Sequence, residues 1–289
     1  MPRPVLHRFR IAWLGLTSAA GSIPVSMLVS LSAVTVAAWA LTLHQALSMS
    51  VPMGTAMSGG MAADGMGGMV MGGMSAAGWS LAGLVVFVAA WTVMMAAMML
   101  PAAAPMILTF ASAQGRRDQR VAVPTWIFVA GYILVWGAVG LLVYVVVQFG
   151  VELASRLTSP DRALWAPLAL GTTLMIAGLY QFTPVKRVCL HHCRSPLAFV
   201  AQYWRDGRVG ALGMGLRHGL YCLGCCWALF SVLVAAGTMS LAWMLLLTLV
   251  VFAEKVLPHG RRTSAIVGAA FIALGLLVAS GAVSLSGHA

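Results

Sequence analysis

The chain has 289 residues, of which 61% are hydrophobic and only 8% are charged, and its mean hydropathy is +0.95. A soluble domain carries about 25% charged residues, so this composition excludes a water-soluble globular protein and indicates one that is surrounded by lipid. The net charge of +11 does not indicate a nucleic-acid partner, because the basic residues stand in short gaps between apolar runs and do not cluster on a polar surface.

Apolar runs long enough to cross a membrane occur along most of the chain. A helix needs about 20 apolar residues to cross the hydrocarbon core of a bilayer, and seven runs approach this length: residues 23–43, 79–100, 125–149, 163–183, 218–237, 240–258 and 264–284. We therefore predict an all-α, polytopic transmembrane helix bundle of about seven spans. A tight turn at 237–240 is expected to divide the long apolar stretch 218–258.

The distribution of basic residues predicts the orientation of these spans. With a cytosolic N-terminus, all lysines and arginines except Arg156 and Arg162 fall in cytosolic segments, as the positive-inside rule requires. An alternative for the first run is a signal peptide, since Ala38-Trp39-Ala40 resembles a cleavage site. However, the run is longer than the 7–15 residues of a usual signal-peptide core, so we favour a retained first span.

Three parts of the chain differ in composition. Residues 1–43 contain a basic flank and the first span, residues 44–78 form an extracytoplasmic loop rich in Met and Gly, and residues 79–289 form a domain of six spans. Residues 184–219 are expected to lie in the cytosol. Within that segment, Ser195-Pro196 predicts the start of a short helix along the membrane interface, with Ser as the cap and Pro at the first helical position.

The first chemically distinctive segment is Cys189-Leu190-His191-His192-Cys193. If this segment is helical, Cys189, His192 and Cys193 share one face, because residues three and four positions apart lie above one another on a helix. The side chain of His191 then points away from that face.

The second segment runs from His218 to Cys226. At about 100° per residue, His218, Cys222, Cys225 and Cys226 fall within one stripe of a helix. Thiolate and imidazole ligands suit Cu(I) or Zn(II), so the two segments predict a metal site at the cytosolic edge of the membrane. The alternative is that these cysteines are small apolar residues that fill the bundle.

Methionines follow a helical spacing in the second apolar run. Met94 with Met98 and Met95 with Met99 are i, i+4 pairs, and Pro101 follows them. Thioether sulfur is an uncharged soft ligand that selects Cu(I), so these residues are a candidate intramembrane metal site. Methionine is also an ordinary apolar filler of helix bundles, and this alternative remains open.

The loop 44–78 contains a third group of soft ligands. Its eight methionines are Met49, Met53, Met57, Met61, Met66, Met69, Met71 and Met74. They predict copper capture outside the cytosol, where cysteines tend to oxidise, although a Met-rich spacer would have the same composition. In the predicted topology, thioethers outside and within the bilayer lead to thiols on the cytosolic side.

Few acidic residues fall inside apolar runs, and no phosphate-binding loop is present. Glu254 lies near the cytosolic end of one run and is expected to pair with a nearby basic residue. Tyr180, Gln181, Lys186 and Arg187 are expected to be interface anchors and orientation signals.

The sequence resembles the bacterial family of predicted metal-binding integral membrane proteins, a domain of unknown function sometimes labelled copper chaperone. Three stretches carry the resemblance, residues 91–101, 178–196 and 217–227, and it covers roughly residues 80–260. It implies a multi-pass metal-binding protein of the bacterial inner membrane.

From these observations we predict a protein, not an enzyme, that binds Cu(I), or alternatively zinc, and moves or delivers it. The expected partners are the lipid bilayer and a soluble metallochaperone or metalloenzyme recipient. One alternative is a membrane thiol-disulfide oxidoreductase using Cys222 and Cys225, whose C-x-x-C spacing is that of a redox pair. Another is an accessory membrane subunit of a larger complex.

Overall fold

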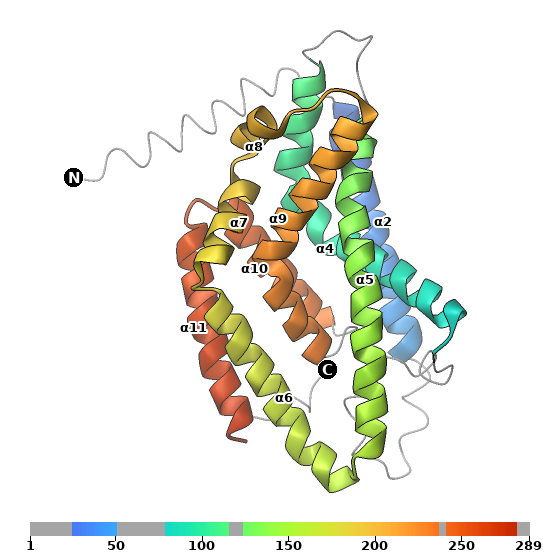
Figure 1. Cartoon of the computed structure of the whole chain (residues 1–289), viewed down its shortest axis with the longest axis vertical. Coiled ribbons are helices and arrows are strands. Elements are labelled where there is room, and N and C mark those ends of the chain that lie inside the picture. The colour runs from blue at the N-terminus through green and yellow to red at the C-terminus, as the bar shows by residue number, and fades with distance from the viewer. Residues whose placement is uncertain (1–24, 51–78, 116–123, 237–240, 282–289) are drawn as a thin grey trace, which may run out of the picture.

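The computed structural model of the protein describes residues 25–50, 79–115, 124–236 and 241–281. Throughout these ranges the regular elements are helices (Figure 1), as the sequence predicts. They are α2 (Val25–Ser50), α4 (Leu81–Gly115), α5 (Thr125–Arg156), α6 (Ser159–Tyr180), α7 (Pro184–Arg194), α8 (Pro196–Tyr203), α9 (Gly207–Ala236), α10 (Leu241–Val256) and α11 (Gly260–Ala279). Most of the Met-rich segment, residues 51–78, and the turn at 237–240 lie outside the described residues.

Five of the described helices, α2, α4, α5, α9 and α11, are long and apolar enough to cross a membrane. Helices α6 and α7 satisfy the same criteria only as a pair, and they are bent by 66° at the break between them. Helix α10 has 16 residues, which extend over about 24 Å and fall short of the roughly 30 Å of a hydrocarbon core. The described part of the chain therefore contains five candidate spans, or six if the bent pair is one span, and the predicted span 240–258 is not among them.

The short helix α8 begins where the sequence predicts a helix start, and α7 begins in the same way with a proline after a hydroxyl residue. The side chain of Thr183 accepts a hydrogen bond of 3.3 Å from the backbone N–H of Lys186 at the start of α7. Helix α8 starts directly after Ser195, as predicted, but the Ser195 side chain makes no capping hydrogen bond. Instead, the backbone carbonyl of Ser195 accepts from the N–H of Phe199 at 2.9 Å.

The segment 184–219 is mostly helical, since it contains α7, α8 and the first turns of α9. Helix α9 begins at Gly207, well before the predicted start at residue 218. Helices α7 and α9 pack against each other, and α7 also contacts α10. This arrangement places the two cysteine-containing segments on neighbouring helices.

Helices α5 and α9 cross with their backbones in contact. A Cβ atom added to Gly215 would overlap the backbone carbonyl of Phe128, and one added to Gly131 would overlap the carbonyl of Leu212. Only glycine permits this approach, because any other side chain would push the two backbones apart.

Substituting Gly215 with alanine is expected to lower the free energy of unfolding by about 1–3 kcal/mol, the usual effect of overpacking. Gly213 is the matched control, because it lies on the same helix and a Cβ added there would meet nothing within 4 Å. Gly213→Ala should be neutral or stabilising by up to about 1 kcal/mol, since alanine favours a helix over glycine. Thermal unfolding in detergent measures both variants, and equal midpoints would contradict the close crossing.

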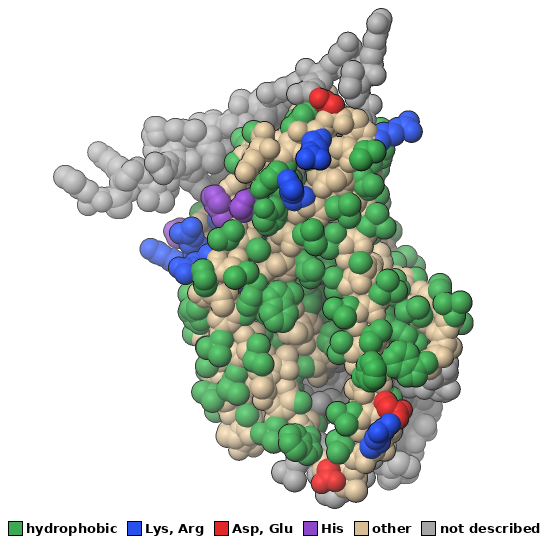
Figure 2. All heavy atoms as spheres, in the orientation of Figure 1, with side chains coloured by type: hydrophobic (Ala, Val, Ile, Leu, Met, Phe, Trp, Pro, Cys, Tyr) green, Lys and Arg blue, Asp and Glu red, His purple; other side chains and the backbone are tan. Residues whose placement is uncertain are grey.

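Charged side chains are unevenly distributed over the molecule (Figure 2). Basic side chains gather toward the end that carries α7 and α8, and fewer charges lie at the opposite end. At that opposite end, Arg156 and Glu152 form an exposed ion pair with a separation of 2.8 Å between nitrogen and oxygen. This asymmetry supports the predicted orientation, which remains a prediction because the structure contains no membrane.

Candidate metal centre

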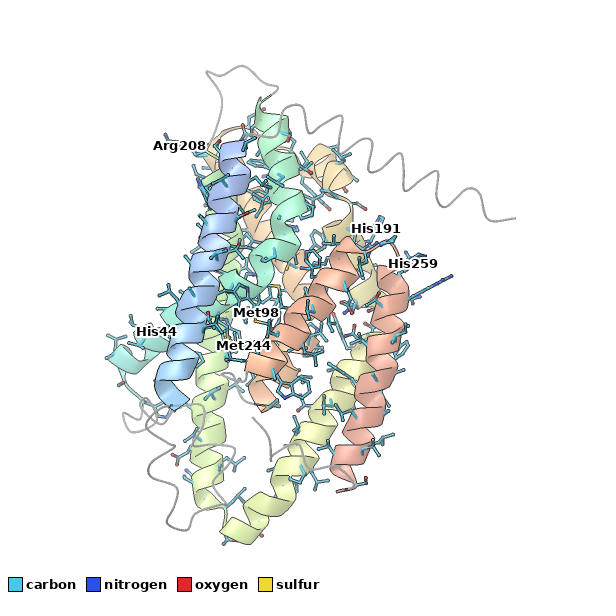
Figure 3. The ribbon with its side chains drawn as sticks, turned by 180° about the vertical axis from the view of Figure 1, so that it is seen from behind. His44, Met98, His191, Arg208, Met244 and His259 are labelled. Carbon is cyan, nitrogen blue, oxygen red and sulfur yellow. The ribbon has the colours of Figure 1, made fainter. Side chains whose placement is uncertain are left out.

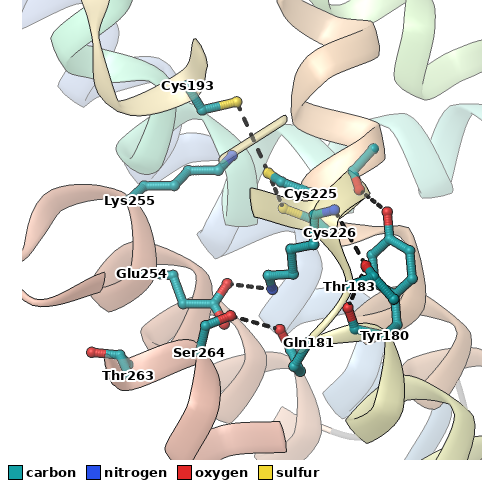
Figure 4. Close-up of polar contacts among 12 residues, drawn as sticks. Tyr180, Gln181, Thr183, Cys193, Cys225, Cys226, Glu254, Lys255, Thr263 and Ser264 are labelled. Carbon is teal, nitrogen blue, oxygen red and sulfur yellow. Dashed lines mark hydrogen bonds and ion pairs between the residues drawn. The ribbon is translucent and has the colours of Figure 1, made fainter. Parts of the chain in front are cut away.

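Three cysteine sulfurs from α7 and α9 lie in contact (Figure 4). Cys193 Sγ on α7 lies 3.9 Å from Cys225 Sγ on α9, and Cys225 Sγ lies 3.2 Å from Cys226 Sγ. All three thiols are free. A thiolate lies about 2.3 Å from a bound zinc ion, so two sulfurs that share an ion of that size are at most about 4.6 Å apart. Both sulfur–sulfur distances meet this limit.

Cys222 lies one turn before the other cysteines of α9 and has different partners. Its sulfur accepts a hydrogen bond from the ammonium group of Lys255 on α10, with Nζ and Sγ 2.8 Å apart. The hydroxyl of Tyr132 on α5 lies 3.1 Å from the same sulfur. Cys222 and Tyr132 are fully buried, and Lys255 is only 7% exposed. A neighbouring cation stabilises a thiolate, so Lys255 supplies a compensating charge inside the bundle.

His218 is buried one turn before Cys222, and neither of its ring nitrogens has a hydrogen-bond partner. Its ring stacks between Tyr132 and Phe128, with centroid distances of 5.4 and 6.1 Å. A buried polar group without a partner costs about 1–3 kcal/mol and therefore calls for an explanation. An imidazole with free nitrogens beside a cysteine cluster has the character of a metal ligand.

Cys189 and His192 occupy the outer side of the cluster. A Cβ added to Gly224 would lie 2.7 Å from Cys189 Sγ, so the sulfur rests directly against the backbone of α9. The ring of His192 stacks on Tyr221 at 4.2 Å, and its Nδ1 lies 2.9 Å from a carbonyl oxygen of its own helix. Cys189 is thus close to the cluster, whereas His192 packs against an aromatic ring at its edge.

The predicted ligands are brought together but do not close around one point. No group of three or more His, Cys, Asp or Glu side chains within the described ranges has the arrangement of a metal site. Cys193, Cys225 and Cys226 touch through their sulfurs, and Cys222 and His218 lie on the preceding turns of α9. Binding of an ion would therefore require side-chain rearrangement within this cluster.

The predicted methionine site lies in the interior of the bundle. Met94 is 4% exposed, and Met95, Met98 and Met99 are fully buried on α4. Met244 on α10 is also fully buried, and Figure 3 shows it near Met98 where α4 and α10 pack together. The sequence gives no reason to select Met244, since it is an isolated methionine in an apolar run. Burial is expected of both a thioether site and a packed core, so the methionine site stays a prediction.

A buried ion pair fixes α7 beside α10. Lys186 Nζ lies 2.7 Å from Glu254 Oε2, and both side chains are 1% exposed. The prediction that Glu254 pairs with a basic residue is confirmed. The expectation that Lys186 and Gln181 are interface anchors is wrong, because both are buried. Arg194 strengthens the connection by donating to backbone carbonyls after α10, including that of Leu257 at 2.6 Å.

A family model described as a copper chaperone, PpoB2, matches residues 88–278, more than half of the sequence. The chain belongs to the copper chaperone family. No curated protein and no solved structure matches it.

The region that matches the copper chaperone family begins within α4 and ends within α11. It therefore includes both cysteine segments and the α4 methionines. The family description is consistent with copper as the metal, and the donor set present, thiols with a buried imidazole, suits that metal. The N-terminal helix and the Met-rich segment 51–78 lie outside the match.

Proposed function

We propose that this member of the copper chaperone family is a multi-pass protein of the bacterial inner membrane that binds Cu(I) as cargo and passes it on. The observation that carries the proposal is the contact between Cys193 on α7 and Cys225 on α9, which joins two thiol segments distant in sequence. Thiolates are soft ligands that suit Cu(I). Zinc is the alternative, but structural zinc sites are almost always closed by four ligands.

The charge of Lys255 favours a monovalent cargo. Cu(I) bound by two thiolates carries a net charge of −1, which the ammonium of Lys255 would neutralise. A divalent ion on the same two thiolates would form a neutral site, so the charge of Lys255 would remain uncompensated. Uncompensated charge is expensive in a protein interior and inside a membrane, so the site as built is best matched to an ion with a single positive charge.

Replacing Lys255 with methionine should therefore shift metal preference toward divalent ions. Ag(I) serves as a monovalent substitute for Cu(I), and we expect the preference for Ag(I) over Zn(II) to fall about tenfold or more. The reason is that the contact between the Lys255 ammonium and the Cys222 sulfur, 2.8 Å apart, is worth more than about 1.4 kcal/mol. Competition binding in detergent measures the ratio. Arg208→Met, which removes an exposed positive charge from α9, is the control. An equal fall in both variants, or no change in either, would contradict this role for Lys255.

The α4 methionines and the Met-rich segment extend the proposal to a route. Thioethers outside and within the bilayer would collect Cu(I), and the stronger thiol ligands would receive it at the cytosolic end. A soluble metallochaperone or a metalloenzyme is the proposed recipient there. Helix α10 packs against α4, which carries these methionines, and near its C-terminal end Lys255 contacts the sulfur of Cys222.

Metal content tests the proposed function. The protein would be purified in detergent under reducing conditions, offered Cu(I), desalted and measured by mass spectrometry, beside a variant in which all five cysteines are serine. We expect about one copper ion per chain in the parent and loss of copper in the variant. Zinc in place of copper would contradict the proposal that the cargo is Cu(I). Equal copper in both proteins would contradict the proposal that the cysteines bind it.

A thiol-disulfide oxidoreductase is the second candidate function. The contact of Lys255 with Cys222 favours it, because a cation-stabilised thiolate is a nucleophile, and Cys225 lies one turn away. This alternative requires that the metal-free protein accelerates thiol-disulfide exchange and that Cys222→Ser abolishes the acceleration. An accessory subunit, by contrast, would tolerate serine at all five cysteines without loss of function in cells.

A further inference from the structure

A cavity of about 260 Å³ lies between the bend that joins α6 to α7 and the start of α11. Gln181 and Phe182 line it from the bend, Lys186 and Arg187 from α7, and Arg261 and Ser264 from α11. The charge on Lys186 is already neutralised by Glu254. No acidic side chain lines the cavity, so its electrostatic character is set by two arginines.

Arg187 and Arg261 are exposed at this cavity, and neither forms an ion pair with a carboxylate in the part of the chain that the structure describes. Gln181 lies at the inner wall and is only 3% exposed. Its Oε1 accepts a hydrogen bond of 3.0 Å from Ser264 Oγ, while its buried Nε2 has no partner (Figure 4). The cavity therefore offers two guanidinium groups and a free amide N–H, and these are donors that suit an anion.

The surroundings of the cavity are apolar. Phe182 is 48% exposed at the bend, Leu179 of α6 is 60% exposed, and Ile266 of α11 is 70% exposed. In a membrane these side chains would face acyl chains. A molecule with a phosphate group and a hydrocarbon tail would match both the hydrogen-bond donors of the cavity and the apolar side chains around it. Free phosphate would match only the donors.

We propose that this cavity binds the phosphate head group of an anionic phospholipid, held by Arg187 and Arg261, with its acyl chains along α6 and α11. The inference rests on the membrane location put forward above and is independent of copper. Basic pockets between spans on the cytosolic side are a recognised form of head-group site. The bound lipid would brace the bend that holds α7 against α9.

Native mass spectrometry of the full chain released from nanodiscs tests the site. The nanodiscs contain phosphatidylcholine with a minor fraction of phosphatidylglycerol, and the variant is Arg187→Gln with Arg261→Gln. Each basic residue near an anionic lipid contributes about 1 kcal/mol, so retention of phosphatidylglycerol should fall roughly 25-fold. The control is Arg205→Gln with Arg208→Gln, which removes two exposed charges elsewhere and should retain the lipid.

Equal loss in the two double variants would overturn the proposal, because general attraction to a basic surface would then explain binding. Displacement of the lipid by millimolar inorganic phosphate would also overturn it, since the site would then be one for a free anion. Copper content measured on the same samples should be unchanged by Arg187→Gln with Arg261→Gln. A copper-free parent that still retains phosphatidylglycerol at this site would reject the proposed function while leaving the lipid site intact.

Discussion

Replacing Lys186 with methionine is expected to lower the free energy of unfolding by about 3–5 kcal/mol, the usual effect of removing one partner of a buried ion pair. The substitution leaves the carboxylate of Glu254 buried and without its ammonium partner, 2.7 Å away in the parent. The second carboxylate oxygen, Oε1, already lacks a hydrogen bond. Denaturant or thermal unfolding in detergent measures the effect.

The double variant Lys186→Met with Glu254→Leu separates charge from packing. It removes both charges and keeps apolar volume at both positions, and such replacements of buried pairs are often neutral or stabilising. We expect it to recover most of the stability that the single substitution loses. A single variant as stable as the parent would show that the pair does not hold α7 against α10.

Cys225→Ser is expected to lower the affinity for Cu(I) by at least about 100-fold, because loss of a ligand should exceed the 10–100-fold effect of disturbing a residue that supports one. Cys225 is the central sulfur, with Cys193 and Cys226 at 3.9 and 3.2 Å. Anaerobic competition against a Cu(I) chelator of known affinity measures the change.

Cys189→Ser is the matched control for this substitution. The Cys189 sulfur rests against the backbone at Gly224, at the outer side of the cluster, so we expect a smaller effect of about tenfold or less. If serine at Cys189 lowers the affinity as much as serine at Cys225 does, the cluster is not centred on Cys225. Unchanged affinity in both variants would place the copper elsewhere.

The spacing of the cysteines and histidines along the sequence was enough to predict which of them share a helix face in each of the two segments. Residues three and four positions apart share a helix face, and the structure has helices at both segments. It also buries Cys222, Cys225 and Cys226, which the spacing predicts to share one stripe of α9. The pairing of α7 with α9 could not be derived this way, because the close approach at Gly224 depends on how the whole bundle packs.

Two features of the site depend on charged residues whose roles spacing does not reveal. Lys255 and Lys186 both stand where basic residues mark orientation, yet the structure buries them against Cys222 and Glu254. A lysine near a span end can reach the interface or turn inward, and only tertiary contacts decide between these. The predicted span 240–258 is also not among the candidate spans of the described residues, because the described helix α10 has only 16 residues.

The most direct test of the central claim is X-ray absorption spectroscopy at the copper edge of the Cu(I)-loaded protein in detergent. The proposed site predicts a Cu(I) edge and a nearest shell made mainly of sulfur, with fewer sulfur neighbours when Cys193 or Cys225 is serine. A shell of nitrogen and oxygen, or a sulfur shell that neither substitution alters, would contradict the assignment of the copper to the thiols of α7 and α9.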